Sequence, residues 1–358
     1  MAVGFPAKTN FATGEVLTAT NMNDITGTLN LLESAQYAAG KNDIINGAFN
    51  VWQRGTSFNQ AYFNAGSLYT ADRMAMLWNN VPTSVTVSQQ TFTPGAAPVA
   101  GYEGTFFLRS LITTVGTCSV WGVQQRIEDV RTLANQTATI SFYAKADTAR
   151  NVTIELTQKF GSGGSSLVTV TATAQAITSS WARYSLTVTV PSISGKTVGT
   201  NSYLELNLLQ AVAAGSTLDV WGVQIEPGST ASPFQTATGS IGGELALCQR
   251  YAFNPLFGET ALFKPVAVGY SVSTTSSRIG LTMPVTMRVS PSLTVTPGDF
   301  SIGYSSGANG LLTNLTVETS SPSNTLLTGT TSGLTANVGY TLYRSTAGTT
   351  NLVLSAEL

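Results

Sequence analysis

Between residues 137 and 209 the chain repeatedly alternates apolar with polar residues, which is the pattern of a half-buried β-strand. In the first such segment, we expect the alternate apolar residues from Ala138 to Ala144 to face the core. We expect the residues that alternate with them to face outward. The segments are TATISFYAKA (137–146), NVTIELTQKF (151–160), WARYSLTVTV (181–190) and SYLELNLL (202–209). Strands that recur about every 10 residues without a long helix indicate a sandwich or jelly roll. We therefore expect an all-β protein with a jelly-roll β-sandwich over residues 42–238.

A helical pattern precedes these strands. Met22, Ile25, Leu29 and Leu32 recur at spacings of three, four and three residues, which is the a/d seam of a short helix. A lone helix of this length is marginal in water, so it must dock on something. Its partner is its own domain, a second copy of the chain, or a larger particle. We assign residues 1–41 to an N-terminal attachment segment with an oligomerising helix.

Residues 239–358 form the third predicted region. It opens with GGELALCQRYAF (242–253), a short apolar link with helical character. The stretch RIGLTMPVTMRVSPSLTVTPGDF (278–300) predicts two or three strands broken by prolines, because proline favours strand ends and edges. From Ser301 on, Leu, Val and Thr alternate with Gly, Ser and Asn turns. We predict a second, smaller β domain here.

The tetrapeptide Trp-Gly-Val-Gln occurs twice, at 121–124 and at 221–224. Two such tryptophans could serve as platforms for stacking sugar rings, or they could belong to two strands that need the same packing. Apolar residues flank Trp221 on both sides, which indicates a central strand that is covered on both faces. Glycine after tryptophan suits a β-bulge or a close approach of another backbone. We therefore interpret both tryptophans as structural.

Charged residues make up only 10% of the 358 residues, whereas 42% are hydrophobic. The net charge of −1 offers no electrostatic surface for nucleic acid or anionic membranes. Histidine is absent, which excludes Ser-His-Asp and Cys-His catalysis and imidazole-ligated metals. No apolar run is long enough to span a membrane, and the N-terminus lacks the pattern of a secretory signal. The two cysteines, Cys118 and Cys248, fit no metal spacing, and we expect them to be buried thiols.

Two neighbouring motifs carry a resemblance to a known family. INGAFNVWQRGTSF (45–58) and YTADRMAMLW (69–78) resemble the start of a β-sandwich domain of bacteriophage tail and fibre proteins, which is similar to jelly-roll carbohydrate-binding modules. The residues that match the first motif are Asn46, Gly47, Phe49, Trp52, Gln53, Arg54 and Gly55. In the second motif, Met74 stands where the family usually has tryptophan. The closing strand at 219–234, the link at 244–251 and the strand pair at 283–295 are also similar to the family.

The resemblance implies a structural protein of the virion, assembled in the host cytoplasm and exposed on the released particle. GEVLTATNMND (14–24) resembles the N-terminal attachment helix of phage fibres. Our first hypothesis is a short, trimeric tail fibre that is fixed by its N-terminus and contacts host surface glycan. The alternative is a capsid decoration or head-fibre protein with a purely structural role. A polysaccharide depolymerase is the third, but such enzymes are usually repetitive β-solenoids, and the chain has no short fixed repeat. We therefore expect no enzyme activity.

Polar and aromatic residues on the outward faces of the predicted strands are candidates for glycan contacts. Aromatic faces stack on sugar rings, and carboxylates and amides bind their hydroxyl groups. The candidates are Tyr143, Glu155, Trp181, Arg183, Tyr203, Glu205 and Asn207. The competing interpretation is that these side chains cover a sheet edge or meet another subunit.

The resemblance also implies a structural calcium ion between the first and last strands of the sandwich. Asp219 on the closing strand matches the position of one ligand, whereas Asn50 stands where the family usually has an acid. Loss of that carboxylate weakens the binding of a hard cation. Glu226 and Asp219 can alternatively be interpreted as a hydrolytic pair. We assign no catalytic residue, no metal ligand and no cofactor beyond this candidate calcium ion near Asp219.

Overall fold

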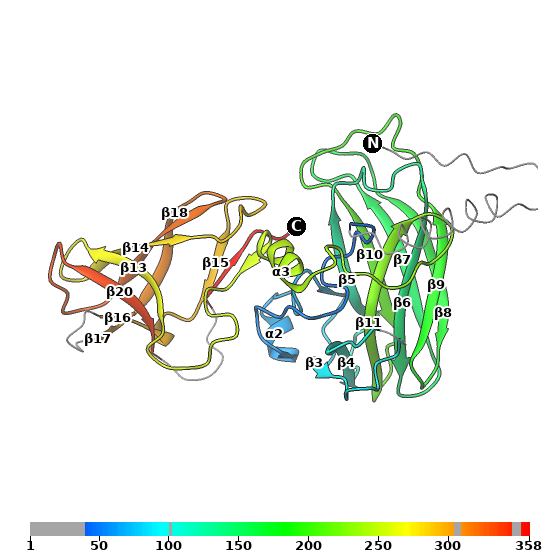
Figure 1. Ribbon diagram of the computed structural model, residues 1–358, viewed down its shortest axis with the longest axis horizontal. Coiled ribbons are helices and arrows are strands. Elements are labelled where there is room, and N and C mark those ends of the chain that lie inside the picture. Colours follow the sequence, from blue (N-terminus) through cyan, green and yellow to red (C-terminus); the bar gives the residue numbers. More distant parts are fainter. Residues whose placement is uncertain (1–39, 100–101, 304–308, 346–351) are drawn as a thin grey trace, which may run out of the picture.

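The chain folds into two bodies that lie side by side along its long axis (Figure 1). The computed structural model describes residues 40–99, 102–303, 309–345 and 352–358. The larger body is a β-sandwich, and the smaller one contains the C-terminal sheets, with the helix α3 (Ile241–Gln249) between the two. The predicted all-β fold class is confirmed.

Two antiparallel sheets make up the sandwich within the described residues. The six-stranded sheet contains, in spatial order, β1 (Ser57–Asn59), β3 (Ser84–Thr91), β4 (Phe106–Thr114), β11 (Ser216–Pro227), β6 (Thr137–Ala146) and β9 (Ala182–Thr189). The five-stranded sheet contains β2 (Ala75–Trp78), β5 (Trp121–Glu128), β10 (Tyr203–Gln210), β7 (Arg150–Lys159) and β8 (Val168–Ile177). A short helix, α2 (Gln60–Asn64), follows β1. Strands far apart in sequence, such as β4 and β11, are neighbours, as in Greek-key sandwiches.

Alternation along the strands places one side of each strand in the core between the sheets, as predicted. Phe142 on β6, Ile154 on β7 and Leu206 on β10 are all buried there. The sequence pattern does not predict β8, VTVTATAQAI, because its alternating residues are mostly Val, Ala and Thr, which differ little in polarity. This strand lies at the edge of its sheet and carries many exposed residues, so it needs no large apolar side chains.

Both Trp-Gly-Val-Gln segments are structural, as predicted, since Trp121 and Trp221 are each 0% exposed. Trp121 points into the core between the sheets, whereas Trp221 lies in an aromatic cluster on the outer face of the six-stranded sheet. The glycines also differ in role. Gly222 has a φ of 63° and lies within a β-bulge. At Gly122, a Cβ would lie 2.5 Å from the carbonyl oxygen of Leu208 on the neighbouring strand.

The C-terminal body consists of a three-stranded and a seven-stranded antiparallel sheet among the described residues. The three-stranded sheet contains β12 (Ala252–Phe253), β21 (Leu352–Ser355) and β15 (Ser292–Val295). The seven-stranded sheet contains β17 (Asn309–Leu311), β16 (Phe300–Gly303), β20 (Gly339–Arg344), β13 (Pro265–Ser271), β14 (Ser276–Thr282), β19 (Asn324–Thr330) and β18 (Asn314–Ser320), with the 3-10 helix η1 (Pro297–Asp299) before β16. Phe300, Leu327 and Leu342 belong to a core separate from that of the sandwich. The predicted helical link corresponds to α3.

Residues of the 45–58 segment lie at the junction between the two bodies. Asn46 adopts a left-handed conformation with a φ of 62°, and its side chain donates to the carbonyl oxygens of Val51 (2.8 Å) and Asp72 (3.0 Å). Gln53 donates to the carbonyl oxygen of Ala252 at 2.6 Å and accepts from the backbone N–H of Asn254 at 3.1 Å. This segment therefore ties the start of the sandwich to the chain that follows α3.

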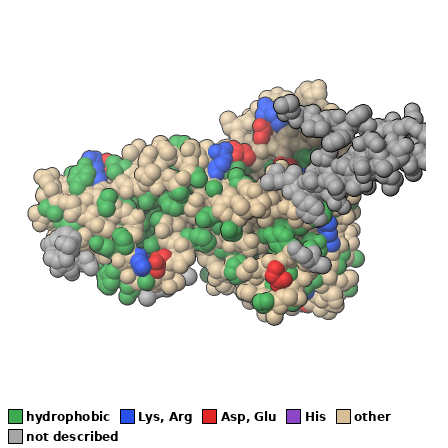
Figure 2. All heavy atoms as spheres, in the orientation of Figure 1, with side chains coloured by type: hydrophobic (Ala, Val, Ile, Leu, Met, Phe, Trp, Pro, Cys, Tyr) green, Lys and Arg blue, Asp and Glu red, His purple; other side chains and the backbone are tan. Residues whose placement is uncertain are grey.

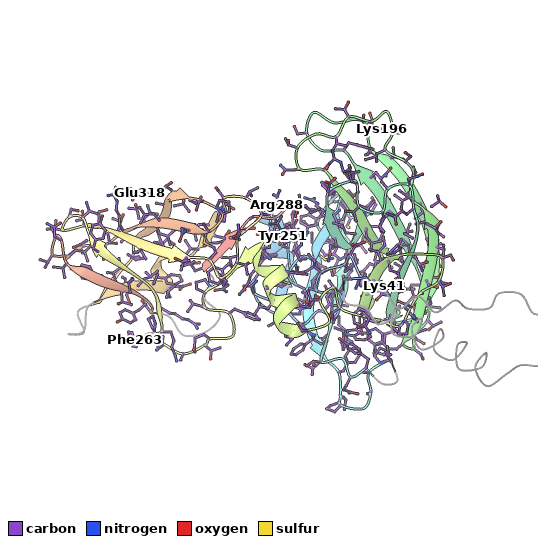
Figure 3. All side chains as sticks on the ribbon, turned by 45° about the horizontal axis from the view of Figure 1, so that its top comes forward. Lys41, Lys196, Tyr251, Phe263, Arg288 and Glu318 are labelled. Carbon is purple, nitrogen blue, oxygen red and sulfur yellow. The ribbon has the colours of Figure 1, made fainter. Side chains whose placement is uncertain are left out.

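A buried cluster of charged groups completes this junction. Arg73 is 1% exposed, and its guanidinium lies 3.6 Å from the centroid of the Tyr251 ring. It pairs with Glu357, which also lies 3.3 Å from Arg54. Arg288 donates to the carbonyl oxygen of Glu357 at 2.7 Å. Tyr251 and Arg288 lie where the two bodies meet (Figure 3).

Three further predictions concern the N-terminal helix, membrane-spanning segments and the two cysteines. The helix predicted at Met22, Ile25, Leu29 and Leu32 lies outside the described residues. Among the residues that are described, no helix is long and apolar enough to cross a membrane. Cys118 and Cys248 are buried and unpaired, as predicted, and burial raises the pKa of both thiols.

Candidate functional site

The structure divides the predicted glycan contacts between the two opposite outer faces of the sandwich. On the five-stranded sheet lie Glu155, Tyr203, Glu205 and Asn207. On the six-stranded sheet lie Tyr143, Trp181 and Arg183. Because the whole sandwich separates these faces, the two groups belong to different surfaces.

Polar side chains on the five-stranded sheet mostly bind one another. Asn207 is 0% exposed, donates to Glu155 at 2.9 Å and accepts from Gln124 at 3.0 Å. The side chain of Glu205 points away from the sandwich core, as predicted, but it is only 5% exposed and lies 3.5 Å from Lys159 Nζ. A ligand would have to replace these internal partners, which limits its net gain in free energy. This face is therefore the weaker candidate.

Tyr203 lies at the end of the same face, near the junction. It is half-buried, opposite Glu128 on β5 and Lys159 on β7. The guanidinium of Arg126 lies 5.2 Å from the centroid of its ring. This cation covers one side of the ring, which reduces the area on which a sugar could stack.

A row of polar and charged side chains crosses the outer face of the six-stranded sheet. From β3 toward β9 it contains Ser88, Arg109, Asp219, Lys145 and Trp181. Asp219 is 1% exposed and accepts two hydrogen bonds from Arg109, both of 2.7 Å. It also lies 3.6 Å from Lys145 Nζ, which in turn lies 5.5 Å from the centroid of the Trp181 ring. One buried carboxylate thus fixes two cations beside a half-buried indole.

The neighbouring row on this face is aromatic. Tyr143 faces away from the sandwich core, as predicted, but it is only 8% exposed because its ring packs on Trp221, with centroids 5.4 Å apart. Phe107 and Phe234 belong to the same cluster. Trp181 packs on the rim of this cluster, 5.3 Å from Phe107, and stays half-buried. Of the two predicted aromatic contacts here, Trp181 is therefore the accessible one.

Arg183 adds a third cation to this face. It donates to the hydroxyl of Ser141 at 3.1 Å and to the carbonyl oxygen of Ser232, and its guanidinium lies 5.7 Å from the Tyr143 centroid. Its Nε is buried and has no hydrogen-bond partner within the described part of the chain. No carboxylate neutralises this guanidinium in the described residues, so it contributes a net positive charge.

We call Arg109, Lys145, Trp181 and Arg183 the glycan face, because these are the residues for which we propose glycan binding below. This face carries three cations and one half-buried indole, with Lys145 nearest to the indole, and the carboxylate of Asp219 contacts both Arg109 and Lys145. An indole can stack on an apolar sugar face, and the cations can hold an acidic group. Alternation within 137–146 marks Lys145 as outward, but the role of Arg109 depends on the pairing of β4 with β11, which no local pattern reveals.

Asp219 does not have the surroundings of a calcium ligand. Arg109 and Lys145 occupy its two oxygens, and Asn50 lies on the inner side of the same sheet, in a pocket at the end of the sandwich. Within the described ranges, no three His, Cys, Asp or Glu side chains come together in a group that could hold a metal ion. The expected calcium position is thus taken by two protein cations.

Glu226 and Asp219 do not form a hydrolytic pair in a cleft. Glu226 is 0% exposed and lies 3.0 Å from Lys41 Nζ, and it accepts hydrogen bonds from Ser232. Burial alone would raise the pKa of Glu226, but the hydrogen bonds from Ser232 and Lys41 outweigh it and hold the pKa below its ordinary value. Each carboxylate therefore has its own cationic partners, on a strand packed on both sides.

Comparison with known proteins reveals similarity of structure alone. No family model matches the sequence, and no curated protein is similar to it in sequence. A putative sugar-binding protein from Bacteroides thetaiotaomicron is similar over 52% of this chain and all (100%) of its own, with 14% identity and a TM-score of 0.35. A CBM22 xylan-binding domain from Paenibacillus barcinonensis is similar over 54% of this chain and 98% of its own, with 15% identity and a TM-score of 0.31. The enzymatically active domain of tailspike protein 4 from bacteriophage CBA120 is similar over 52% of this chain, with 15% identity and a TM-score of 0.34, and the chain spans 22% of that protein.

Proposed function

We infer that this chain is a glycan-binding structural protein of a bacteriophage virion, and that it binds glycan through the glycan face of the six-stranded sheet. The observation that carries this proposal is the position of Trp181, 5.5 Å from Lys145 and beside Arg183. The excess of cations over carboxylates on this face favours an acidic glycan, since charge-assisted hydrogen bonds to carboxylate or phosphate are among the stronger ones.

The composition of the surface supports the choice of this face. Charged residues are only 10% of the chain, and they are sparse on the side of the molecule that Figure 2 shows. A cluster of three cations on such a surface therefore creates a distinct local potential. Clustered cations of this kind steer an acidic ligand toward the half-buried indole.

The virion assignment rests on the family motifs. Residues 45–58 and 69–78 resemble phage fibre domains, and residues 14–24 resemble a phage attachment helix. In this proposal, residues 1–41 fix a trimeric tail fibre to the particle while the sandwich faces the host. A purely structural role at the capsid is the second candidate, favoured by the exposed apolar side chains of the seven-stranded sheet, among which Val268 is 70% and Leu311 is 57% exposed. Neither role includes a catalytic step.

The trimer is directly testable. Multi-angle light scattering of the full chain is expected to give the mass of three 37.4 kDa copies. Two features support this expectation: the a/d spacing from Met22 to Leu32, and the apolar surface around Val268 and Leu311, which would be costly to leave in water. A monomeric mass across the accessible concentration range would contradict it.

Glycan binding is expected to depend on Trp181. Replacing Trp181 with alanine should weaken binding of an acidic oligosaccharide at least tenfold, since losing about 1.4 kcal/mol of stacking raises the dissociation constant by this factor. Lys145→Ala should weaken the same binding and reduce its dependence on salt, because a charge that is screened by ions would be lost. A glycan array with acidic and neutral oligosaccharides selects the ligand, and calorimetry measures its affinity.

Lys196→Ala is the matched control for charge. Lys196 is exposed on a loop at one end of the sandwich, away from the glycan face (Figure 3). Its loss should leave glycan affinity unchanged. Equal weakening by Lys145→Ala and Lys196→Ala would indicate a non-specific charge effect, and unchanged binding by Trp181→Ala would exclude this face.

A further inference from the structure

A pocket lies between the sandwich and the chain that follows α3. The pocket has a volume of about 310 Å³. Its walls come from the 50–56 segment, the ends of β3 and β4, and residues 254–260, which run between the two bodies in Figure 1. The pocket is partly open to solvent, so a ligand can enter it. Junctions between domains are also frequent positions of ligand sites.

The pocket lies at one end of the sandwich, on the inner side of the six-stranded sheet. Gln89 on β3 pairs with Leu108 on β4, and Leu108 is 0% exposed in the core. Directly paired residues share one face of a sheet, and so do residues two apart on one strand. Gln89 and Phe106 therefore point to the inner side of the six-stranded sheet. The glycan face lies on its outer side, so the two sites are separate.

Aromatic rings form the apolar part of the pocket. Trp52 is 3% exposed, and its indole N–H donates to the carbonyl oxygen of Phe49 at 2.6 Å, which fixes the ring. Phe106 is half-buried beside it. Phe257 is 40% exposed and lines the pocket from the opposite side, on the segment after α3. A ligand would thus meet aromatic surface from both bodies.

Two amide side chains in the pocket are available to a ligand. Asn50 Oδ1 is buried and has no hydrogen-bond partner among the described residues. A buried acceptor without a partner is unfavourable by about 1–3 kcal/mol, so a ligand hydroxyl that donates to it would recover this energy. The side chain of Gln89, which lines the same pocket, makes no hydrogen bond within the described ranges. It can both donate to and accept from a ligand.

Two other polar side chains in the wall, Asn254 and Glu259, are already bound. Asn254 Nδ2 donates to the carbonyl oxygen of Gln53 at 2.8 Å, which holds the 254–260 segment against the sandwich. Glu259 accepts from the N–H of Ala261 at 2.9 Å and lies 3.3 Å from Lys264 Nζ, and the hydrogen bond from Ala261 is the main cause that lowers its pKa. Lys264 thus balances the charge of Glu259, and the groups left for a ligand are neutral amides and the hydroxyls of Thr56 and Thr260.

We propose that this pocket binds one neutral sugar unit, held between Phe106 and Phe257 with a hydroxyl donated to Asn50 Oδ1. Aromatic walls with a few convergent amides suit a ring that has an apolar face and a rim of hydroxyl groups. The volume of about 310 Å³ is at the lower end of the range for small-molecule sites, which favours a single unit over a chain. This proposal does not rest on the glycan face or on an acidic ligand.

The test is titration of the full chain with D-glucose, D-galactose, D-mannose, L-rhamnose and N-acetyl-D-glucosamine, followed by saturation-transfer NMR. At least one of these sugars should bind saturably. Asn50→Ala and Phe257→Ala should each raise its dissociation constant about tenfold, which corresponds to about 1.4 kcal/mol. Phe257 is 40% exposed, so its replacement removes ring contact without opening a core.

Phe263→Ala is the matched control, because Phe263 is 58% exposed on the C-terminal body (Figure 3) and does not line the pocket. It should leave sugar binding unchanged. Trp181→Ala should also leave it unchanged, which separates this pocket from the glycan face. Absence of saturable binding by all five sugars would overturn the proposal, and so would equal weakening by Phe257→Ala and Phe263→Ala.

Discussion

Replacing Glu357 with alanine is expected to lower the free energy of unfolding of the sandwich by about 3–5 kcal/mol. The replacement leaves Arg73 buried at 1% exposure without its carboxylate and removes the partner that lies 3.3 Å from Arg54. Urea denaturation followed by tryptophan fluorescence measures the effect on the sandwich alone, since all five tryptophans lie in it, at 52, 78, 121, 181 and 221. A large shift from a residue of the C-terminal body would demonstrate that the two bodies are energetically coupled.

Glu318→Ala is the control for this experiment. Glu318 pairs with Arg278 on the outer side of the C-terminal body, where its side chain is 31% exposed (Figure 3). Exposed ion pairs contribute little to stability because water screens them. We expect no measurable shift of the sandwich transition. Equal effects of the two replacements would contradict the role assigned to the buried cluster.

Asn46→Ala is expected to destabilise the sandwich by about 3 kcal/mol or more. The Asn46 side chain makes three hydrogen bonds to buried backbone groups: it donates to the Val51 and Asp72 carbonyl oxygens and accepts from the Val51 N–H at 3.0 Å. Each buried backbone group left without a partner is unfavourable by about 1–3 kcal/mol. The left-handed conformation at a φ of 62° adds a smaller penalty for alanine. Urea denaturation measures the total loss of unfolding free energy from the two effects.

Asn135→Ala isolates the backbone penalty. Asn135 has a φ of 60° and is exposed on the same sandwich, and its side chain makes no hydrogen bond within the described ranges. Only the cost of the left-handed conformation, about 1–2 kcal/mol, is expected here. If the two variants lost the same stability, the three hydrogen bonds of Asn46 would contribute nothing.

Much of the sandwich could be predicted from alternation. The odd and even positions of 137–146 separate the core side of β6 from its outer side, and Phe142 and Tyr143 lie on the sides expected. Alternation gives the direction of a side chain but not its exposure. Tyr143 is covered because Trp221 packs on it, and Tyr102 and Phe234, from loops far away in sequence, pack on Trp221 in turn. Local patterns contain no information about such coverage.

The candidate sites were harder to predict, since both depend on contacts between distant residues. Arg109 and Asp219 are 110 residues apart in sequence. No local pattern therefore indicated that an arginine, and not a calcium ion, binds the Asp219 carboxylate. Asn50 and Phe257 line the same pocket. Hydrogen bonds between Gln53 and Asn254, which are 201 residues apart in sequence, hold the two segments together. One signal was present: Asn50 departs from the acid of the family pattern at a position that now lines the pocket. Gln53 and Arg54 were recognised as motif residues, but their role in joining the two bodies required the structure.

The buried cluster at the junction also has a consequence for synthesis. Arg73 and its partner Glu357 are 284 residues apart. At about 5–20 residues per second, the ribosome needs roughly 15–60 s to translate the intervening chain. During this interval the nascent sandwich holds Arg73 without the carboxylate that pairs with it in the folded chain. A sandwich released by premature termination would keep this defect, so proteases and chaperones could distinguish incomplete chains from finished ones.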